Sequence, residues 1–216
     1  MNAKLAIVGI VRELVSSKWL LVFAAVGLWG QATSNVKIDS PQARVLVVTE
    51  ESHHRSALHE HPMNRVVIYL GGCQVIRTSA AGDVQKLEFK AGDVRWIPAE
   101  GPHTSEYIAD QPFRIVEIEL KNKPQSPVTM PENDPLKADP KHYSLEFEND
   151  QVRVLRVRFG PHEKGVVHKH KLNHIVVYLN DQARGKAGEV RLDEPMTHTE
   201  ENPLDHPVER LAIDLK

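Results

Sequence analysis

The sequence predicts an all-β protein made of two tandem barrels, the second one shortened. The first observation is an internal repeat, in which the residues around His59-Glu60-His61 recur around His168-Lys169-His170. The second is a series of short Val-, Leu- and Ile-rich runs separated by Gly and Pro turns, a pattern typical of β-sandwiches and barrels. The third is that no amphipathic helix pattern occurs after the first 32 residues. The copied positions include pairs such as Gln42 and Gln151, Asn64 and Asn173, Leu70 and Leu179.

Composition limits the function classes. The 216 residues are 41% hydrophobic and 26% charged, which suits a globular chain with room for two small cores. The formal charge of −2 gives no general attraction to nucleic acid, so we expect no nucleic-acid partner. Cys73 is the single cysteine, which excludes an internal disulfide and a cysteine-based zinc site.

Residues 1–32 are predicted to be a signal peptide. Basic residues precede an apolar run over residues 19–30, and small residues stand at Gly30 and Ala32 before the expected cleavage point. The run is shorter than the roughly 20 apolar residues of a membrane-spanning helix. We therefore expect export, to the periplasm of a bacterium. The alternative is that the segment stays uncleaved and residues 19–30 anchor the protein in the membrane.

The first domain is expected over residues 36–122. It should contain two early strands, a hairpin that turns at residues 80–83, a strand before a loop at 98–102, and a long last strand. The expected strand ranges are Ala43–Thr49, Arg65–Leu70, Cys73–Thr78, Val84–Phe89, Val94–Ile97 and Phe113–Leu120.

Residues 123–140 are expected to be a linker, because they include five prolines and few apolar side chains. The second domain then spans 141–216. It matches the first except between Leu179 and Gly188, where the counterpart of the 73–89 hairpin is missing. The second barrel should therefore lack part of one wall.

The repeated histidines point to metal binding. Alternate residues of a strand face the same side, so His59 and His61 should project together. Two imidazoles on a rigid strand supply half of a metal site. A third imidazole is offered by His103, which follows a Gly-Pro-rich turn. The second copy repeats this arrangement with His168, His170 and His198.

With these motifs the chain resembles the cupin superfamily, and specifically a bicupin. Its members carry a His-x-His motif followed by Glu and Gly, and a second motif with Gly, Pro, Gly and His. The second motif is matched here by Gly92, Pro98, Gly101 and His103. The resemblance covers nearly all of the chain from about residue 40. It implies a jelly-roll barrel in each half, with the histidines inside the barrel mouth.

The chain departs from the family at the glutamate, which is usually a fourth ligand. Arg65 stands there in the first copy and His174 in the second. The first copy is therefore expected to hold a metal on His59, His61 and His103, or none. Arg65 would clamp an anionic substrate or form a salt bridge to Glu60, Glu106 or another carboxylate. The second copy offers His168, His170, His174 and His198, in a site that the missing wall could leave open or unformed.

Three functions remain open. The first is a metal-dependent enzyme with Fe, Zn, Ni, Cu or Mn, because three-histidine cupins include dioxygenases; isomerase chemistry is also compatible. Glu100 or Glu106 would then be the general base. The second is a non-enzymatic periplasmic protein that binds a small anionic ligand or a metal without turnover. The third is a structural cupin without metal. A homodimer is a further expectation, and a membrane is a partner only if the leader is uncleaved.

Overall fold

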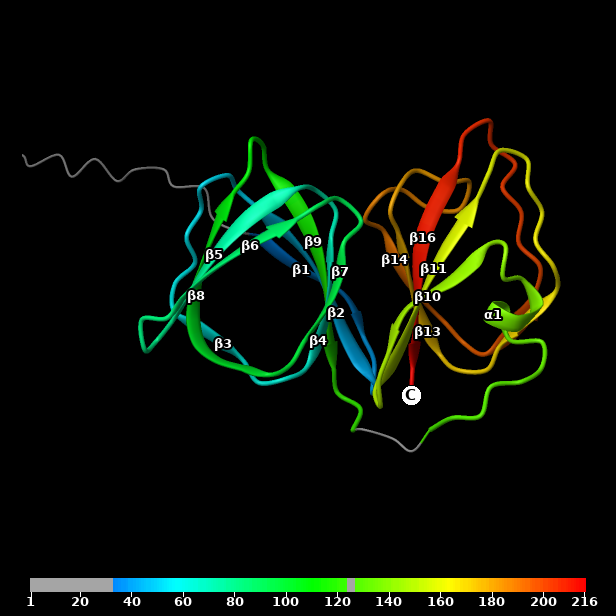
Figure 1. Ribbon diagram of the computed structural model, residues 1–216, viewed down its shortest axis with the longest axis horizontal. Helices are drawn as coiled ribbons and strands as arrows, with labels where there is room; N and C mark the ends of the chain where they lie inside the picture. The colour runs from blue at the N-terminus through cyan, green and yellow to red at the C-terminus, as the bar shows by residue number, and fades with distance from the viewer. Residues whose placement is uncertain (1–32, 124–126) are drawn as a thin grey trace, which may run out of the picture.

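The computed structural model describes residues 33–123 and 127–216, and it is almost entirely β-structure. The predicted signal peptide at 1–32 lies outside the described residues. Within them, no helix is long and apolar enough to cross a membrane. The strands form two barrels that lie side by side (Figure 1), which confirms the predicted all-β tandem architecture.

The first barrel has two sheets. Its five-stranded sheet has the order β1-β2-β9-β4-β7, and its four-stranded sheet has the order β3-β8-β5-β6. The larger sheet contains β1 (Thr33–Asp39), β2 (Ala43–Glu50), β4 (Arg65–Tyr69), β7 (Val94–Ile97) and β9 (Phe113–Leu120). The smaller contains β3 (His59–His61), β5 (Cys73–Ser79), β6 (Val84–Phe89) and β8 (Glu100–Ile108). The β5–β6 hairpin is where the sequence predicts it, whereas the expected 98–102 loop runs partly into β8.

The second barrel repeats the larger sheet but not the smaller one. Its five strands have the equivalent order β10-β11-β16-β13-β14, and only β12 pairs with β15 beside them. The strands are β10 (Tyr143–Glu148), β11 (Val152–Phe159), β12 (His168–His170), β13 (His174–Tyr178), β14 (Val190–Asp193), β15 (Met196–His198) and β16 (Val208–Leu215). As predicted from the shortened repeat, nothing in this barrel corresponds to the β5–β6 hairpin.

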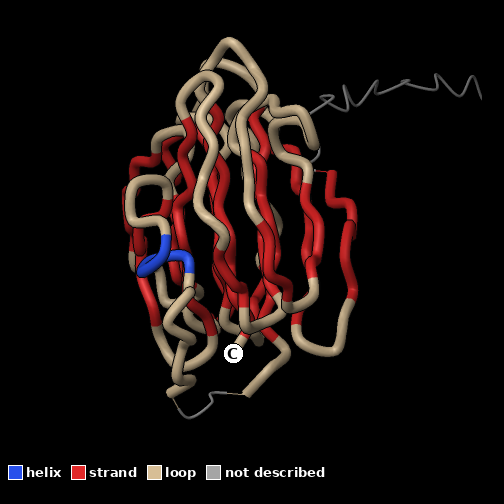
Figure 2. Tube along the Cα trace, turned by 90° about the vertical axis from the view of Figure 1, so that its right-hand side faces the viewer, coloured by secondary structure: helices blue, strands red, loops and turns tan. Residues whose placement is uncertain are grey.

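Part of the expected linker is integral to the second barrel. The short helix α1 (Pro135–Ala138) begins after Asp134, whose carboxylate accepts a hydrogen bond from the Leu136 amide. Asp134 is buried and also binds Arg153 of β11. The helix lies beside the strands of the second barrel, as Figure 2 shows. Proline content alone suggested a linker, but the buried Asp134 carboxylate holds the segment against the barrel.

The two large sheets pack against each other through their outer faces. In β2, Val45 and Val47 face the other half of the chain, while Leu46 and Val48 belong to the core inside the first barrel. The shared core contains residues of both halves, including Ile118 and Ile213, which are fully buried. This double burial explains why the strands of the large sheets are apolar on both faces.

The packing of the halves is reciprocal. A Cβ added to Gly188 would lie 2.7 Å from Leu70, and one added to Gly92 would lie 3.8 Å from Leu179. Leu70 and Leu179 are equivalent in the repeat, and both glycines have positive φ angles. The halves are therefore related by an approximate twofold axis, as in an isologous dimer interface.

Candidate metal centres in the two barrels

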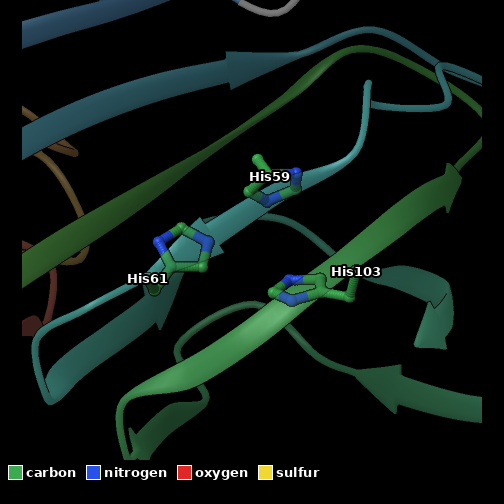
Figure 3. A group of neighbouring side chains, drawn as sticks. All are labelled: His59, His61 and His103. Atoms are coloured by element: carbon green, nitrogen blue, oxygen red, sulfur yellow. The ribbon is translucent and has the colours of Figure 1, made fainter. Parts of the chain in front are cut away.

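The structure brings together the three predicted histidines of the first barrel. His59 and His61 project from β3, and His103 of β8 is the strand partner of His59 (Figure 3). The ring centroids lie 4.9 Å apart for His59 and His61, and 4.6 Å apart for His59 and His103. One ligand nitrogen from each ring lies within 4.8 Å of the other two. The arrangement is that of three convergent imidazoles on two paired strands.

Backbone carbonyls orient two of these rings. Nδ1 of His59 lies 2.9 Å from the Ala57 carbonyl, and Nδ1 of His103 lies 2.9 Å from the Gly101 carbonyl. Because a carbonyl only accepts, each Nδ1 carries the proton and each Nε2 keeps its lone pair. Such a bond fixes both the tautomer and the orientation of a metal-binding histidine.

Burial favours the neutral imidazole form of His61 and His103. It lowers the pKa of His61 to about 3, with help from the positive charge of Arg65 and from His59. Burial also lowers the pKa of His103. Neutral imidazole is the form that binds a metal. Three imidazole nitrogens suit iron, zinc, nickel or copper better than an all-oxygen ion, so these residues fit the divalent metal that the sequence predicts.

The three histidines line a cavity of about 500 Å³ inside the first barrel. Its apolar side includes Val67 and Ile115, and its polar side includes Tyr69, Tyr107, Glu50 and Glu117. Tyr69 and Tyr107 have raised pKa values because they are buried, so both carry neutral hydroxyls. The cavity has the size of a small-molecule site with a few placed polar groups.

Arg65 is held by carboxylates. Its Nη2 lies 2.9 Å from Glu100 and its Nη1 lies 3.2 Å from Glu117, while the Arg65 side chain is only 3% exposed. Glu100 also binds Arg77 at 2.6 Å. The structure thus shows the predicted salt-bridge alternative, although with these partners and not with Glu60 or Glu106. The substrate clamp expected of Arg65 would compete with the two carboxylates that already bind its Nη1 and Nη2 groups, whereas its buried Nε has no hydrogen-bond partner.

The general bases suggested by the sequence are poorly placed. Glu100 is engaged by two guanidinium groups. Glu106 follows Ser105 and precedes Tyr107, which both line the cavity. Because side chains alternate along a strand, Glu106 of β8 faces the other side of the sheet. The expectation for Glu106 was wrong for this reason.

Glu117 is the cavity carboxylate that sequence reasoning missed. Burial raises its pKa, while the Arg65 charge opposes that rise. A second carboxyl, Glu50, has a pKa raised by burial and lies 3.4 Å from His54. The available signal was an acidic residue two positions after Ile115, and therefore on the same face of the strand as that apolar side chain. Two acids with raised pKa values thus share the cavity with the imidazoles.

The second barrel brings its four histidines into one cluster, in which three are buried and His198 is half-buried. His168, His170 and His174 are at most 2% exposed. The His168 and His198 centroids lie 4.6 Å apart, and the His170 and His174 rings stack at 4.2 Å. Burial lowers the pKa of His198 to about 4 and also lowers the pKa values of His168 and His174.

The open or unformed second site anticipated from the missing hairpin was therefore wrong. Tyr143 of β10 reaches the cluster, and its hydroxyl lies 3.0 Å from Nε2 of His168. The same hydroxyl donates to Glu200, which is paired with Arg210. These side chains, together with the α1 segment, close the barrel. Among the described residues, the only sizeable cavity lined by a histidine triad is in the first barrel.

Comparison with known proteins gives no match in sequence but a clear match in fold. No protein-family model and no curated protein matches the chain. Oxalate decarboxylase from Bacillus subtilis is similar in structure, with a TM-score of 0.59 at 13% identity, over 86% of this chain and 72% of that one. AerE from Microcystis aeruginosa gives 0.59 at 10% identity, over 88% and 95% of the two chains.

A cupin 2 conserved barrel domain protein from Leptotrichia buccalis gives a TM-score of 0.52 at 14% identity, over 87% of this chain and 90% of that one. These similarities extend over both halves of the chain. At such low identities they establish the architecture and not the activity. The chain therefore has the cupin fold, in two tandem jelly-roll barrels.

Proposed function

We propose that the first barrel binds one divalent transition metal through His59, His61 and His103 and uses it to act on a small molecule in the adjoining cavity. The observation that carries this proposal is the convergence of three imidazoles on a cavity of about 500 Å³. Three protein ligands and an adjacent cavity are typical of catalytic metal sites, whereas structural sites are closed. A bound metal would supply Lewis acidity or a binding position for dioxygen.

The protein groups around this centre would handle protons and orientation. Glu117 would take a proton from the substrate or return it, because burial places its pKa above that of an ordinary carboxyl. Tyr69 and Tyr107 would orient substrate oxygens through their hydroxyls. Arg65 would hold Glu117 in position through their ion pair. An anionic substrate would also contact Arg65 if it displaced one of the two carboxylates.

The metal can be tested by elemental analysis of the purified full chain after metal loading and gel filtration. We expect His61→Ala/His103→Ala to have one bound metal fewer than the wild type. His206→Ala should match the wild type, because His206 is exposed and remote from the cavity lining. Equal metal content in the triad variant and the wild type would contradict the proposal.

Enzymatic activity is tested by oxygen uptake with thiol, diketone and flavonoid substrates. We expect uptake that depends on the metal and falls in Glu117→Gln while metal content stays the same. The alternative function is a periplasmic protein that binds a small ligand without turnover. It is favoured by the replacement of the family glutamate with Arg65, and it predicts ligand binding by calorimetry without oxygen consumption.

We also propose that the protein is exported to the periplasm, on the pattern of residues 1–32. N-terminal sequencing of the cellular protein should give a start near Thr33. A start at Met1 in the membrane fraction would instead indicate that residues 19–30 anchor the protein.

A further inference from the structure

Two buried polar atoms in the second barrel face each other without a partner. Nδ1 of His170 and Oδ1 of Asp214 lie 3.9 Å apart, and neither has a hydrogen bond. Their residues are 2% and 1% exposed, so bulk solvent does not reach these atoms. A distance of 3.9 Å is too long for a hydrogen bond, which needs about 2.7–3.2 Å. It is compatible with two ligands of one ion, because ligands about 2.1 Å from a metal can lie up to about 4.2 Å apart.

His174 supplies a third donor beside this pair. Its Nδ1 lies 3.3 Å from the Leu172 carbonyl, so Nε2 keeps the lone pair. One ligand atom each from His170, His174 and Asp214 lies within 4.8 Å of the other two. The two rings are stacked, with a 16° angle between their planes. Since a lone pair lies in its ring plane, ion binding would turn the rings out of this stack.

Arg153 orients the Asp214 carboxylate. Oδ2 of Asp214 accepts from Nε of Arg153 at 2.8 Å, and Arg153 in turn binds Asp134 at 2.7 Å. This leaves Oδ1 as the oxygen that faces the histidines. Such an outer contact is the usual support of a carboxylate ligand.

The charges of the cluster favour a cation. Three carboxylates and two guanidinium groups surround the histidines, which leaves one negative charge without a counterpart. The acids are Asp134, Asp193 and Asp214, and the bases are Arg153 and Arg191. An uncompensated buried charge is costly, and a bound cation would offset it.

We infer that His170, His174 and Asp214 form a second metal site, closed to solvent and filled by a divalent transition metal such as zinc when the barrel folds. The site shares His170 with the triad of His168, His170 and His198, but it uses His174 and Asp214 in place of His168 and His198. In that triad the Tyr143 hydroxyl lies against Nε2 of His168. The role of the second metal site is structural, because all three ligand residues are at most 2% exposed and a closed site of this kind leaves no open position for a substrate. The inference does not depend on the function proposed for the first barrel.

The test uses the full chain with His61→Ala/His103→Ala, which removes the first-barrel site. This protein is refolded with zinc, dialysed against a chelator and analysed for metal. We expect about one zinc per chain to remain. Adding Asp214→Asn should speed zinc release at least about 10-fold, whereas adding His198→Ala should leave it unchanged. Circular dichroism checks that each variant is folded.

Two results would overturn the inference. Zinc that is absent from the folded background protein would show that the cluster is a hydrogen-bonded core. Zinc that survives Asp214→Asn and is lost with His198→Ala would place the ion on the triad. If both variants lose zinc or fail to fold, X-ray absorption of the zinc-loaded background protein decides. Two imidazoles with oxygen ligands support the inference, and three or more imidazoles contradict it.

Discussion

Asn64 donates a hydrogen bond from its side-chain Nδ2 to Oε1 of Gln151, 2.6 Å away, and so joins one barrel to the other. The repeat-related pair makes the same bond in the opposite direction, from Nδ2 of Asn173 to Oε1 of Gln42 at 2.7 Å. Each partner in one barrel thus has an equivalent in the other. The two amide pairs fix the register of the large sheets, while the shared apolar core supplies most of the packing.

Gln151→Ala should destabilise the protein more than the truncation of an exposed glutamine does. The change removes the acceptor of Asn64 and the donor to the Asn122 carbonyl at 2.5 Å. Because Gln151 is 3% exposed, the Asn64 amide and the Asn122 carbonyl would be left buried without these partners. The free energy of unfolding should fall by about 1–3 kcal/mol as a result. Urea unfolding measures this loss, with the exposed Gln74→Ala as the control. Equal unfolding free energies for the two variants would show that the amide pair contributes nothing.

Gly188→Ala should disturb the contact between the barrels, and Gly82→Ala provides its control. Both glycines have positive φ angles, so both substitutions cost about 1–2 kcal/mol of backbone strain. A Cβ at Gly82 meets nothing within 4 Å, whereas one at Gly188 would lie 2.7 Å from Leu70. The added crowding should cost Gly188→Ala about 1–3 kcal/mol more. Thermal unfolding measures the difference. Equal midpoint temperatures for the two variants would contradict this expectation.

Much of the fold is predictable because the repeat and the period-two patterns are local properties of the sequence. The β5–β6 hairpin and its absence from the second barrel follow from an alignment of the two copies. The contact between the large sheets does not, since strands apolar on both faces can be covered in several ways. The role of residues 127–140 was also hidden, because it depends on Asp134 reaching Arg153 across the fold.

The candidate sites show the same limit. His59, His61 and His103 are predictable because their motif spacing places them on paired strands. The pairing of Arg65 with Glu117 depends on the register between β4 and β9, which a single sequence does not fix. The contact of Tyr143 with the histidine cluster of the second barrel likewise depends on where β10 lies. The sequence showed only that a hairpin was missing, and it gave no reason to expect β10 beside the cluster.

Stability should decrease as the pH falls from about 6.5 toward 4 in the metal-free protein. In the unfolded chain an imidazole takes up a proton near pH 6.5. In the folded chain His61 stays neutral to about pH 3 and His198 to about pH 4, because burial disfavours their charged forms. The unfolded state therefore binds more protons across this range, and acid favours it.

This dependence can be assigned by measuring urea unfolding at several pH values in the presence of a chelator. His198→Gln should make the free energy of unfolding fall less steeply between pH 6.5 and 4. The exposed His206→Gln should leave the slope unchanged. If the free energy of unfolding of His198→Gln fell with pH as steeply as that of the wild type, the burial of His198 would not contribute to acid unfolding.

Arg65 and Glu117 should behave as a coupled pair whose contribution to the free energy of unfolding depends on pH. Arg65→Met leaves the buried Glu117 carboxylate without its cation, which should cost about 3–5 kcal/mol near neutral pH. Glu117→Gln in the Arg65→Met background should recover part of that loss, with a coupling energy of about 0.5–3 kcal/mol. A double-mutant cycle of urea unfolding at pH 7 measures the coupling.

Lower pH should relieve the Arg65→Met defect. Without the guanidinium, the pKa of Glu117, already raised by burial, rises further above its unfolded value. A carboxyl whose pKa is higher in the folded than in the unfolded chain destabilises the fold at pH values above its unfolded pKa. This destabilisation disappears at low pH, where the carboxyl is protonated in both the folded and the unfolded state. The difference between Arg65→Met and wild type should therefore shrink from pH 7 to pH 4. A constant difference would mean that Arg65 stabilises the barrel through packing of its side chain and not through its charge.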